Sequence, residues 1–147
     1  MRCPRCHRPL FRSDRPPLRV WTCVRCRGCT ATIAVLRRVI LADALQRVWN
    51  LTIGRVRRSL LRCPSCARAM NVVPTDGPVI DLCRGCQLLW FDAGELEAMP
   101  HRPAEEVAAE DRAARREEEQ QARGRRELSH EALTAWMTRR GYASSRW

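Results

Sequence analysis

Residues 63–86 read CPSCARAMNVVPTDGPVIDLCRGC and contain two C-x-x-C pairs separated by sixteen residues. Two apolar stretches, MNVV and VIDL, flank the segment PTDGP, whose Asp-Gly dipeptide is typical of a hairpin turn. A β-hairpin brings the two cysteine pairs to the same end, where four thiolates can hold one zinc ion tetrahedrally. The stretch therefore predicts a small fold built around a four-cysteine zinc site.

The same pattern occurs sixty residues earlier, in CPRCHRPLFRSDRPPLRVWTCVRC at residues 3–26. PLFRS and LRVWT take the places of the two apolar stretches, and Leu36 matches Leu96. The repeat predicts two β-hairpin zinc ribbons, each with one structural zinc. The expected ligands are Cys3, Cys6, Cys23, Cys26, Cys63, Cys66, Cys83 and Cys86.

Cys29 is the ninth cysteine and has no counterpart in the second copy. Cys26 and Cys29 also form a C-x-x-C pair, but the sixty-residue register favours Cys23 and Cys26 and leaves Cys29 as a buried or free thiol. A redox role for Cys83 and Cys86 would require a βαβ context, which the sequence does not indicate. Four protein ligands close the coordination shell, so the expected zinc is structural.

All 27 basic residues are arginine, and the formal charge is +11. Two zinc ions, each held by four thiolates, would lower this charge to about +7. A basic surface favours anionic partners such as nucleic acid, although arginine in place of lysine can also reflect genomic base composition. No signal peptide follows Met1 and no long apolar run is present, so we expect a cytoplasmic protein without a membrane part.

The segment after Cys86 predicts a short capped helix. Asp92 is placed as its N-cap, Glu95 can complete a capping box, and Leu96 provides an apolar face. Trp90 and Phe91 precede the cap and are expected to enlarge the small core. Stacking of these rings on nucleic-acid bases is the alternative.

These residues carry a resemblance to a known family. CPSC, the hairpin and CRGCQLLWFDAGEL resemble the transcription factor IIB-type zinc ribbon family of bacterial proteins, with the first copy degenerate. The resemblance implies a zinc ribbon fold and involvement in transcription or nucleic-acid binding. The family usually has glycine after the second cysteine of each pair, so we expect backbone strain at the residues found here instead, which are His7, Arg27, Ala67 and Gln87.

Residues 31–53 have apolar side chains at helical spacing and predict an amphipathic helix packed on the ribbons. A basic helix lying along nucleic acid or in a partner's groove is the alternative. A basic linker follows this helix. Its arginines are the best candidates for an anionic contact, namely Arg55, Arg57, Arg58 and Arg62.

The C-terminal part predicts a solvated charged helix from Pro103 to about Gln121. A second, short amphipathic helix follows Gly124, with Ser129 as its cap and Gly141 as its end. Its apolar face is a candidate site for docking to a protein partner or for folding back on the ribbons. That face consists of Leu133, Trp136 and Met137.

Taken together, the sequence predicts a small zinc-stabilised α+β protein. The expected parts are ribbon 1 (1–30), the amphipathic helix and basic linker (31–61), ribbon 2 with its capped helix (62–100) and the charged helical tail (101–147). The predicted function is a non-enzymatic binding module, either a transcription-associated or nucleic-acid-binding regulator or a protein-interaction adaptor that docks through its C-terminal helix. No pair of nucleophile and base and no phosphate-binding loop indicates catalysis, so no small-molecule substrate is expected.

Overall fold

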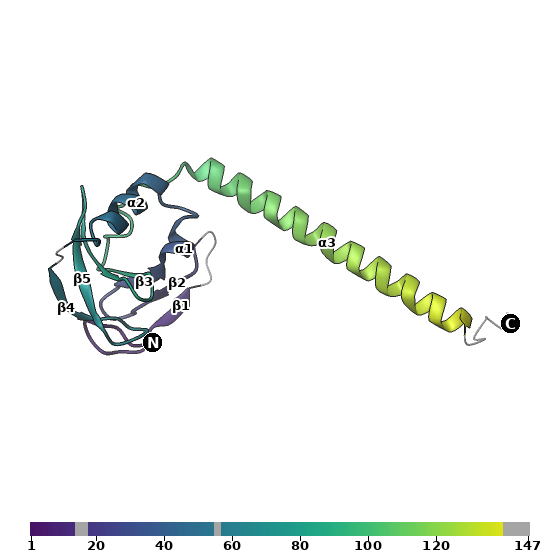
Figure 1. Ribbon diagram of the computed structural model, residues 1–147, viewed down its shortest axis with the longest axis horizontal. Helices are drawn as coiled ribbons and strands as arrows, with labels where there is room; N and C mark the ends of the chain where they lie inside the picture. Colours follow the sequence, from purple (N-terminus) through teal and green to yellow (C-terminus); the bar gives the residue numbers. More distant parts are fainter. Residues whose placement is uncertain (14–17, 55–56, 140–147) are drawn as a thin grey trace. The chain divides into compact units, whose positions relative to one another are not determined.

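The computed structural model describes residues 1–13, 18–54 and 57–139 of the 147-residue chain (Figure 1). The chain divides into two compact units, Met1–Val107 and Ala108–Trp147. The strands are β1 (Phe11–Ser13), β2 (Val20–Thr22), β3 (Cys29–Thr32), β4 (Arg58–Arg62), β5 (Ala69–Pro74), β6 (Val79–Cys83) and β7 (Leu88–Phe91). The helices are α1 (Ile33–Leu36), α2 (Ala42–Asn50) and α3 (Ala104–Arg139).

The described strands form one antiparallel sheet in the order β1-β2-β3-β7-β6-β5-β4. The two ribbons are therefore continuous with each other, because the last strand of ribbon 1, β3, pairs with the last strand of ribbon 2, β7. Thr30 pairs with Trp90, its own counterpart sixty residues further along the chain. A shift of sixty residues exchanges the paired positions 29 and 91 with 89 and 31 and returns the pair of Thr30 and Trp90 to itself. A local pseudo-twofold axis therefore passes through this pair.

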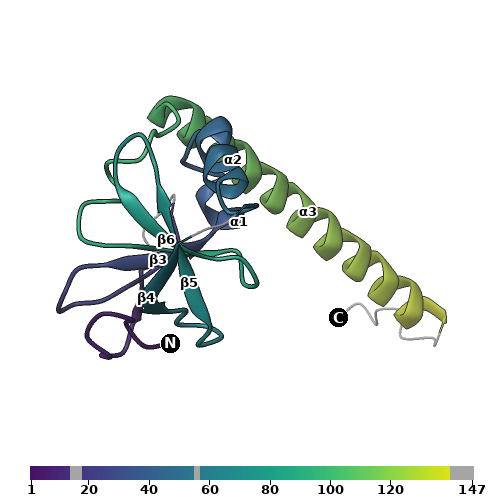
Figure 2. The same ribbon diagram turned by 60° about the vertical axis from the view of Figure 1, so that its left-hand side comes forward.

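The sheet separates two apolar clusters. Residues paired across neighbouring strands lie on the same face, and the row that contains Trp90 lies on the face that carries the eight repeated cysteines. The adjacent row, which contains Cys29, Phe91 and Ile80, lies on the opposite face and packs under α1 and α2 (Figure 2). Each face is thus covered by a different kind of structure: cysteine loops on one side and helices on the other.

The helix expected over residues 31–53 is instead a strand end, a short helix and a second helix. Thr32 ends β3 and caps α1, because its Oγ1 accepts the N–H of Val35 at 3.4 Å. Residues 39–41 leave the helical path and pair with residues 100–102: Leu41 N–H donates to Pro100 O at 3.0 Å, and Arg102 N–H donates to Val39 O at 2.7 Å. The helical apolar pattern resumes in α2, which buries Ala44, Leu45 and Val48.

The helix expected after Asp92 is a series of turns. Gly94 adopts φ +84°, which interrupts a right-handed helix at its start. Half of the predicted capping box is present, since a carboxylate oxygen of Glu95 accepts the backbone N–H of Asp92 at 2.7 Å. Leu96 is buried, as expected of the apolar face, and so is Met99.

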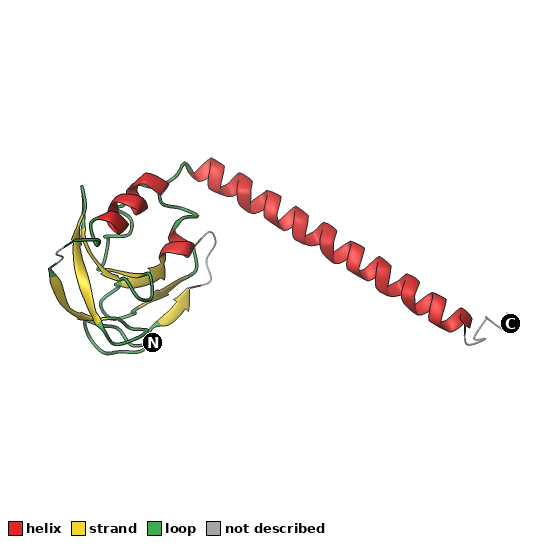
Figure 3. Ribbon diagram, in the orientation of Figure 1, coloured by secondary structure: helices red, strands yellow, loops and turns green. Residues whose placement is uncertain are grey.

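The charged tail is one helix, α3, rather than two (Figure 3). Gly124 lies inside it, and Ser129 donates its hydroxyl to Arg125 O at 2.8 Å as an interior helical residue instead of capping a new helix. Gly141, the expected end, lies outside the described residues. Among the residues that the structure describes, no helix is both long and apolar enough to cross a membrane. The prediction of a small α+β fold followed by a charged α-helical tail is confirmed.

Candidate metal centres

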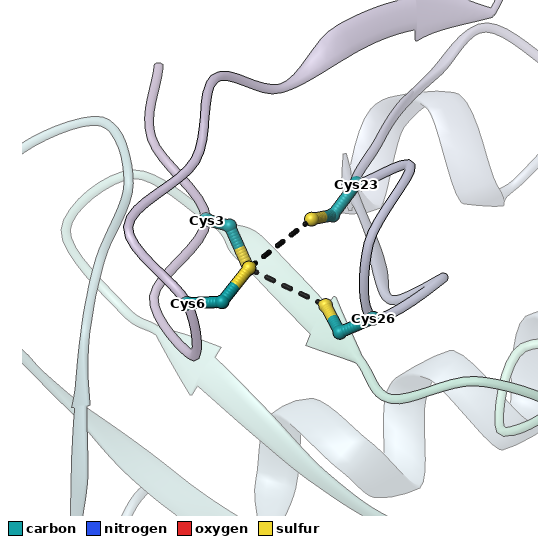
Figure 4. A group of neighbouring side chains, drawn as sticks. All are labelled: Cys3, Cys6, Cys23 and Cys26. Atoms are coloured by element: carbon teal, nitrogen blue, oxygen red, sulfur yellow. Dashed lines mark hydrogen bonds between the residues drawn. The ribbon is translucent and has the colours of Figure 1, made fainter.

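The first cysteine group joins two loops of ribbon 1 (Figure 4). Cys3 and Cys6 precede β1, and Cys23 and Cys26 lie between β2 and β3. The sulfurs of the two loops face each other, with 3.5 Å between the Sγ atoms of Cys3 and Cys26 and 3.4 Å between those of Cys6 and Cys23. All four sulfurs lie within 4.8 Å of one another.

The second cysteine group repeats this arrangement in ribbon 2. Cys63 and Cys66 lie between β4 and β5, whereas Cys83 and Cys86 come from the end of β6 and the turn before β7. The Sγ atoms of Cys66 and Cys83 are 3.6 Å apart, and the four sulfurs again lie within 4.8 Å of one another.

Both groups fit a zinc ion in size and chemistry. Four Zn–S bonds of about 2.3 Å in a tetrahedron place the sulfurs about 3.8 Å apart, close to the observed separations of 3.4–3.6 Å. A disulfide would require a separation of about 2.05 Å, and the cysteines are free thiols. Each group could therefore hold one structural zinc ion.

The loops direct backbone N–H groups at the sulfurs. Ser65 N–H donates to Cys63 Sγ at 3.4 Å. Backbone hydrogen bonds of this kind favour the thiolate and lower the pKa of Cys23 to about 6 and that of Cys66 to about 7. Desolvation by burial acts in the opposite direction and raises the pKa of Cys3 and of Cys63 to about 12. A bound divalent cation compensates such burial, because it stabilises the thiolate directly.

The residue after the second cysteine of each pair adopts the left-handed conformation, which confirms the expected strain. The φ values are +59° at His7, +60° at Arg27, +59° at Ala67 and +51° at Gln87. The left-handed turn closes each loop; for example, Ala67 N–H donates to Cys63 O at 2.9 Å. A residue with a Cβ pays about 1–2 kcal/mol for this conformation.

An arginine supports each of the two equivalent loops. An N–H of Arg2 donates to His7 O at 3.2 Å, and an N–H of Arg62 donates to Ala67 O at 3.3 Å. Arg62, predicted as an anionic contact, thus has a structural hydrogen bond. Arg57 and Arg58 are exposed at the other end of the edge strand β4, which begins at Arg58 and ends at Arg62. Arg55 lies outside the described residues.

Cys29 lies apart from both groups. Its side chain is buried in the apolar cluster under the helices, and its backbone pairs with Phe91. Desolvation raises the pKa of this thiol to about 12. Cys29 belongs to neither of the potential metal-binding groups found among the described residues. This agrees with the expectation that Cys29 is a buried thiol outside the ligand set.

Trp90 and Phe91 are fully buried on opposite faces of the sheet, which confirms their role in the core. Gly28 makes room for the indole ring: a Cβ at this position would lie 2.4 Å from Trp90 Cζ2 and 3.0 Å from Phe91 O. This close approach could not be predicted from the repeat, because Gly28 aligns with Leu88 in the other copy.

Asp92 connects the two ribbons. Arg5 Nε donates to Asp92 Oδ1 at 2.7 Å, a second N–H of Arg5 pairs with Oδ2, and Trp90 Nε1 donates to Oδ1 at 3.1 Å. Burial opposes ionisation, but these hydrogen bonds outweigh it and lower the pKa of Asp92. Sequence reasoning assigned Asp92 only to a cap, because its partner Arg5 lies 87 residues away.

The apolar side chains proposed for docking lie on the last third of α3. Leu133, Trp136 and Met137 are all exposed, and so is Leu128. All of them lie on one helix.

Residues 62–100 match the family model of the TFIIB-type zinc ribbon, described as a transcription factor zinc-finger. This match confirms the resemblance for ribbon 2, and the structure shows the second cysteine group in ribbon 1, outside the matched range. A search of curated proteins and a search of solved structures gave no significant match. Zinc ribbons of this family are typically non-catalytic.

Proposed function

We propose that this chain is a non-enzymatic module that binds two structural zinc ions and contacts nucleic acid as a transcription-associated regulator. The observation that carries the proposal is the pair of cysteine groups, whose sulfurs converge at separations suited to tetrahedral zinc. The proposed ligands are Cys3, Cys6, Cys23 and Cys26 for one ion and Cys63, Cys66, Cys83 and Cys86 for the other.

A structural role for zinc follows from the ligand number. Four thiolates leave no position for water or substrate, and the metal therefore stabilises the fold rather than activating a reactant. The apolar cluster on this face includes the cysteines themselves, so the loops depend on the ion for their packing. The contact with nucleic acid is then made by side chains of the protein and not by the metal.

Two observations support nucleic acid as the partner. The ribbon 2 match is to a transcription factor zinc-finger family. The chain has a formal charge of +11, in which every positive charge is an arginine side chain. Arginine donates forked hydrogen bonds to phosphate and gives sequence-independent affinity through counterion release. Of the contact candidates that the sequence indicates, Arg57, Arg58 and Arg62 are all exposed, and Arg62 also donates a hydrogen bond to Ala67 O.

Zinc analysis combined with a salt titration tests this proposal. Protein purified without chelator should contain two zinc equivalents and bind a fluorescent mixed-sequence duplex or single strand. The logarithm of the binding constant should fall linearly with the logarithm of salt concentration. Absence of binding to both probes at low salt would reject the nucleic-acid function, and a metal content below two would reject the ligand assignment.

The exposed apolar residues of α3 support a second candidate, a protein-interaction adaptor. Leu133 and Met137 are spaced for one helical face, as helix-in-groove partners require. In that case, a partner identified by co-purification should be lost in Leu133→Ala, while zinc content stays at two. Binding of the same partner to this variant with unchanged affinity would reject the role of the α3 face.

A further inference from the structure

The two pseudo-symmetric ribbons carry opposite charge. Residues 1–30 contain eight arginines and a single acidic residue, Asp14, for a formal charge of +7. Residues 62–100 contain three arginines and five acidic residues, for a formal charge of −2. A zinc ion with four thiolates would lower both values by two, so the difference between the ribbons does not depend on the metal.

The arginines of ribbon 1 lie at its surface. Each one in the described residues is exposed: Arg2, Arg5, Arg8, Arg12, Arg19, Arg25 and Arg27. The described stretches 1–13 and 18–42 contain no acidic residue. Arg8 belongs to the first cysteine loop, whereas Arg25 and Arg27 belong to the second, and these two loops face each other across the cysteine group (Figure 4).

Arg5 differs from the other loop arginines because its guanidinium is paired with Asp92 of ribbon 2. This contact fixes the first loop against the second ribbon. The remaining basic side chains of the loop pair are therefore presented on a supported surface rather than on a free segment.

The acidic residues of ribbon 2 point to a difference in role. Asp81, Asp92 and Glu95 all act electrostatically on Arg5, and Asp76 lies near Arg47 at 3.8 Å. Among charged side chains, a phosphate backbone would meet the exposed Asp76 and Glu97 on ribbon 2, where like charge repels it, but only arginines on the described part of ribbon 1.

We propose that ribbon 1, rather than ribbon 2, is the zinc ribbon that contacts nucleic-acid phosphates, with Arg8, Arg25 and Arg27 as its principal contacts. This inference rests on the proposed nucleic-acid function and deepens it. The exposed guanidinium groups suit phosphate oxygens in particular, because arginine donates forked hydrogen bonds to them.

The pseudo-symmetry provides a matched control. Arg2 and Arg8 of ribbon 1 correspond to Arg62 and Arg68 of ribbon 2, with the same backbone bonds and the same arginine-to-carbonyl hydrogen bond in both loops. The variants Arg2→Glu/Arg8→Glu and Arg62→Glu/Arg68→Glu thus change the net charge equally and remove equivalent structural contacts.

Binding of a fluorescent mixed-sequence duplex and a single strand is measured by anisotropy for both variants across a salt series. The ribbon 1 variant should bind about tenfold or more weakly than wild type and lose about two units of salt slope, whereas the ribbon 2 variant should change affinity less than about threefold. An equal or larger loss in the ribbon 2 variant would overturn the inference while leaving the proposed function intact. No binding by wild-type protein would instead reject the proposed function.

Two further measurements separate loss of phosphate contacts from loss of folding and nucleic acid from acidic protein. Arg25→Glu lies on an exposed loop position and should weaken binding on its own even if the double variant loses zinc; unchanged affinity in Arg25→Glu would count against the inference. Polyglutamate serves as an acidic protein-like probe, and wild-type protein that binds it as tightly as nucleic acid would overturn the assignment of phosphate as the ligand.

Discussion

Ala67, the left-handed residue of the loop that carries Cys63 and Cys66, offers a direct test of the loop geometry. Ala67 has φ +59° and is exposed, and Ala69, two residues later, is an exposed residue at the start of β5. Ala67→Gly and Ala69→Gly are the same chemical change at neighbouring positions. The structure predicts opposite effects on the free energy of unfolding.

The magnitude follows from two terms. The left-handed backbone costs a residue with a Cβ about 1–2 kcal/mol, and glycine loses about 0.5–1 kcal/mol more backbone entropy on folding than alanine. Ala67→Gly removes the first cost and adds the second, so it should stabilise by about 0.5–1 kcal/mol. Ala69→Gly adds only the entropic cost and should destabilise by about 0.5–1 kcal/mol.

Denaturant unfolding at a fixed free zinc concentration measures both variants, because metal binding and folding are linked in sites of this kind. A chelator competition provides a second reading, in which zinc affinity should rise about two- to fivefold in Ala67→Gly. A loss of stability in Ala67→Gly as large as that in Ala69→Gly would refute the left-handed geometry of the loop.

Three more outcomes are expected. Metal analysis should find one zinc equivalent in Cys83→Ser and two in Cys29→Ala, because only Cys83 lies in a cysteine group; two equivalents in Cys83→Ser would contradict the ligand assignment. Gly28→Ala should destabilise by about 1–3 kcal/mol in denaturant unfolding, since its Cβ would lie 2.4 Å from Trp90 Cζ2, and an unchanged midpoint would contradict the packing. Chelation should abolish the tertiary signal of the first unit but leave most of the helical ellipticity at 222 nm, because α3 buries only Val107; complete loss of ellipticity would show that α3 depends on the metal.

Features with strong local signals could be predicted from the sequence. The spacing of the cysteines identified both groups, and the burial of Trp90 and Phe91 followed from their place between loop and turn. The left-handed loop positions were also anticipated, because the resemblance placed glycine there. In each case, the residues that determine the feature are close together or repeated in register.

The errors arose where distant segments decide the backbone path. The apolar pattern of residues 31–53 is compatible with one helix, but hydrogen bonds from residues 39–41 to residues 100–102 divide it. The joining of β3 to β7 and the contact of Arg5 with Asp92 likewise depend on residues about sixty or more positions apart, as the pairing of Thr30 with Trp90 shows. Local propensity contains no information about such partners.

The pairing of Thr30 with Trp90 also bears on how such a protein can assemble. The two ribbons meet as the subunits of a twofold dimer do, through the same strand of each. A chain with a single ribbon would have to recruit a second molecule to cover that strand, at a cost that depends on concentration. Tandem duplication makes the encounter intramolecular, with an effective concentration of about millimolar for short linkers. The two halves of one chain also need not have the same sequence, so one ribbon can be basic while the other is acidic.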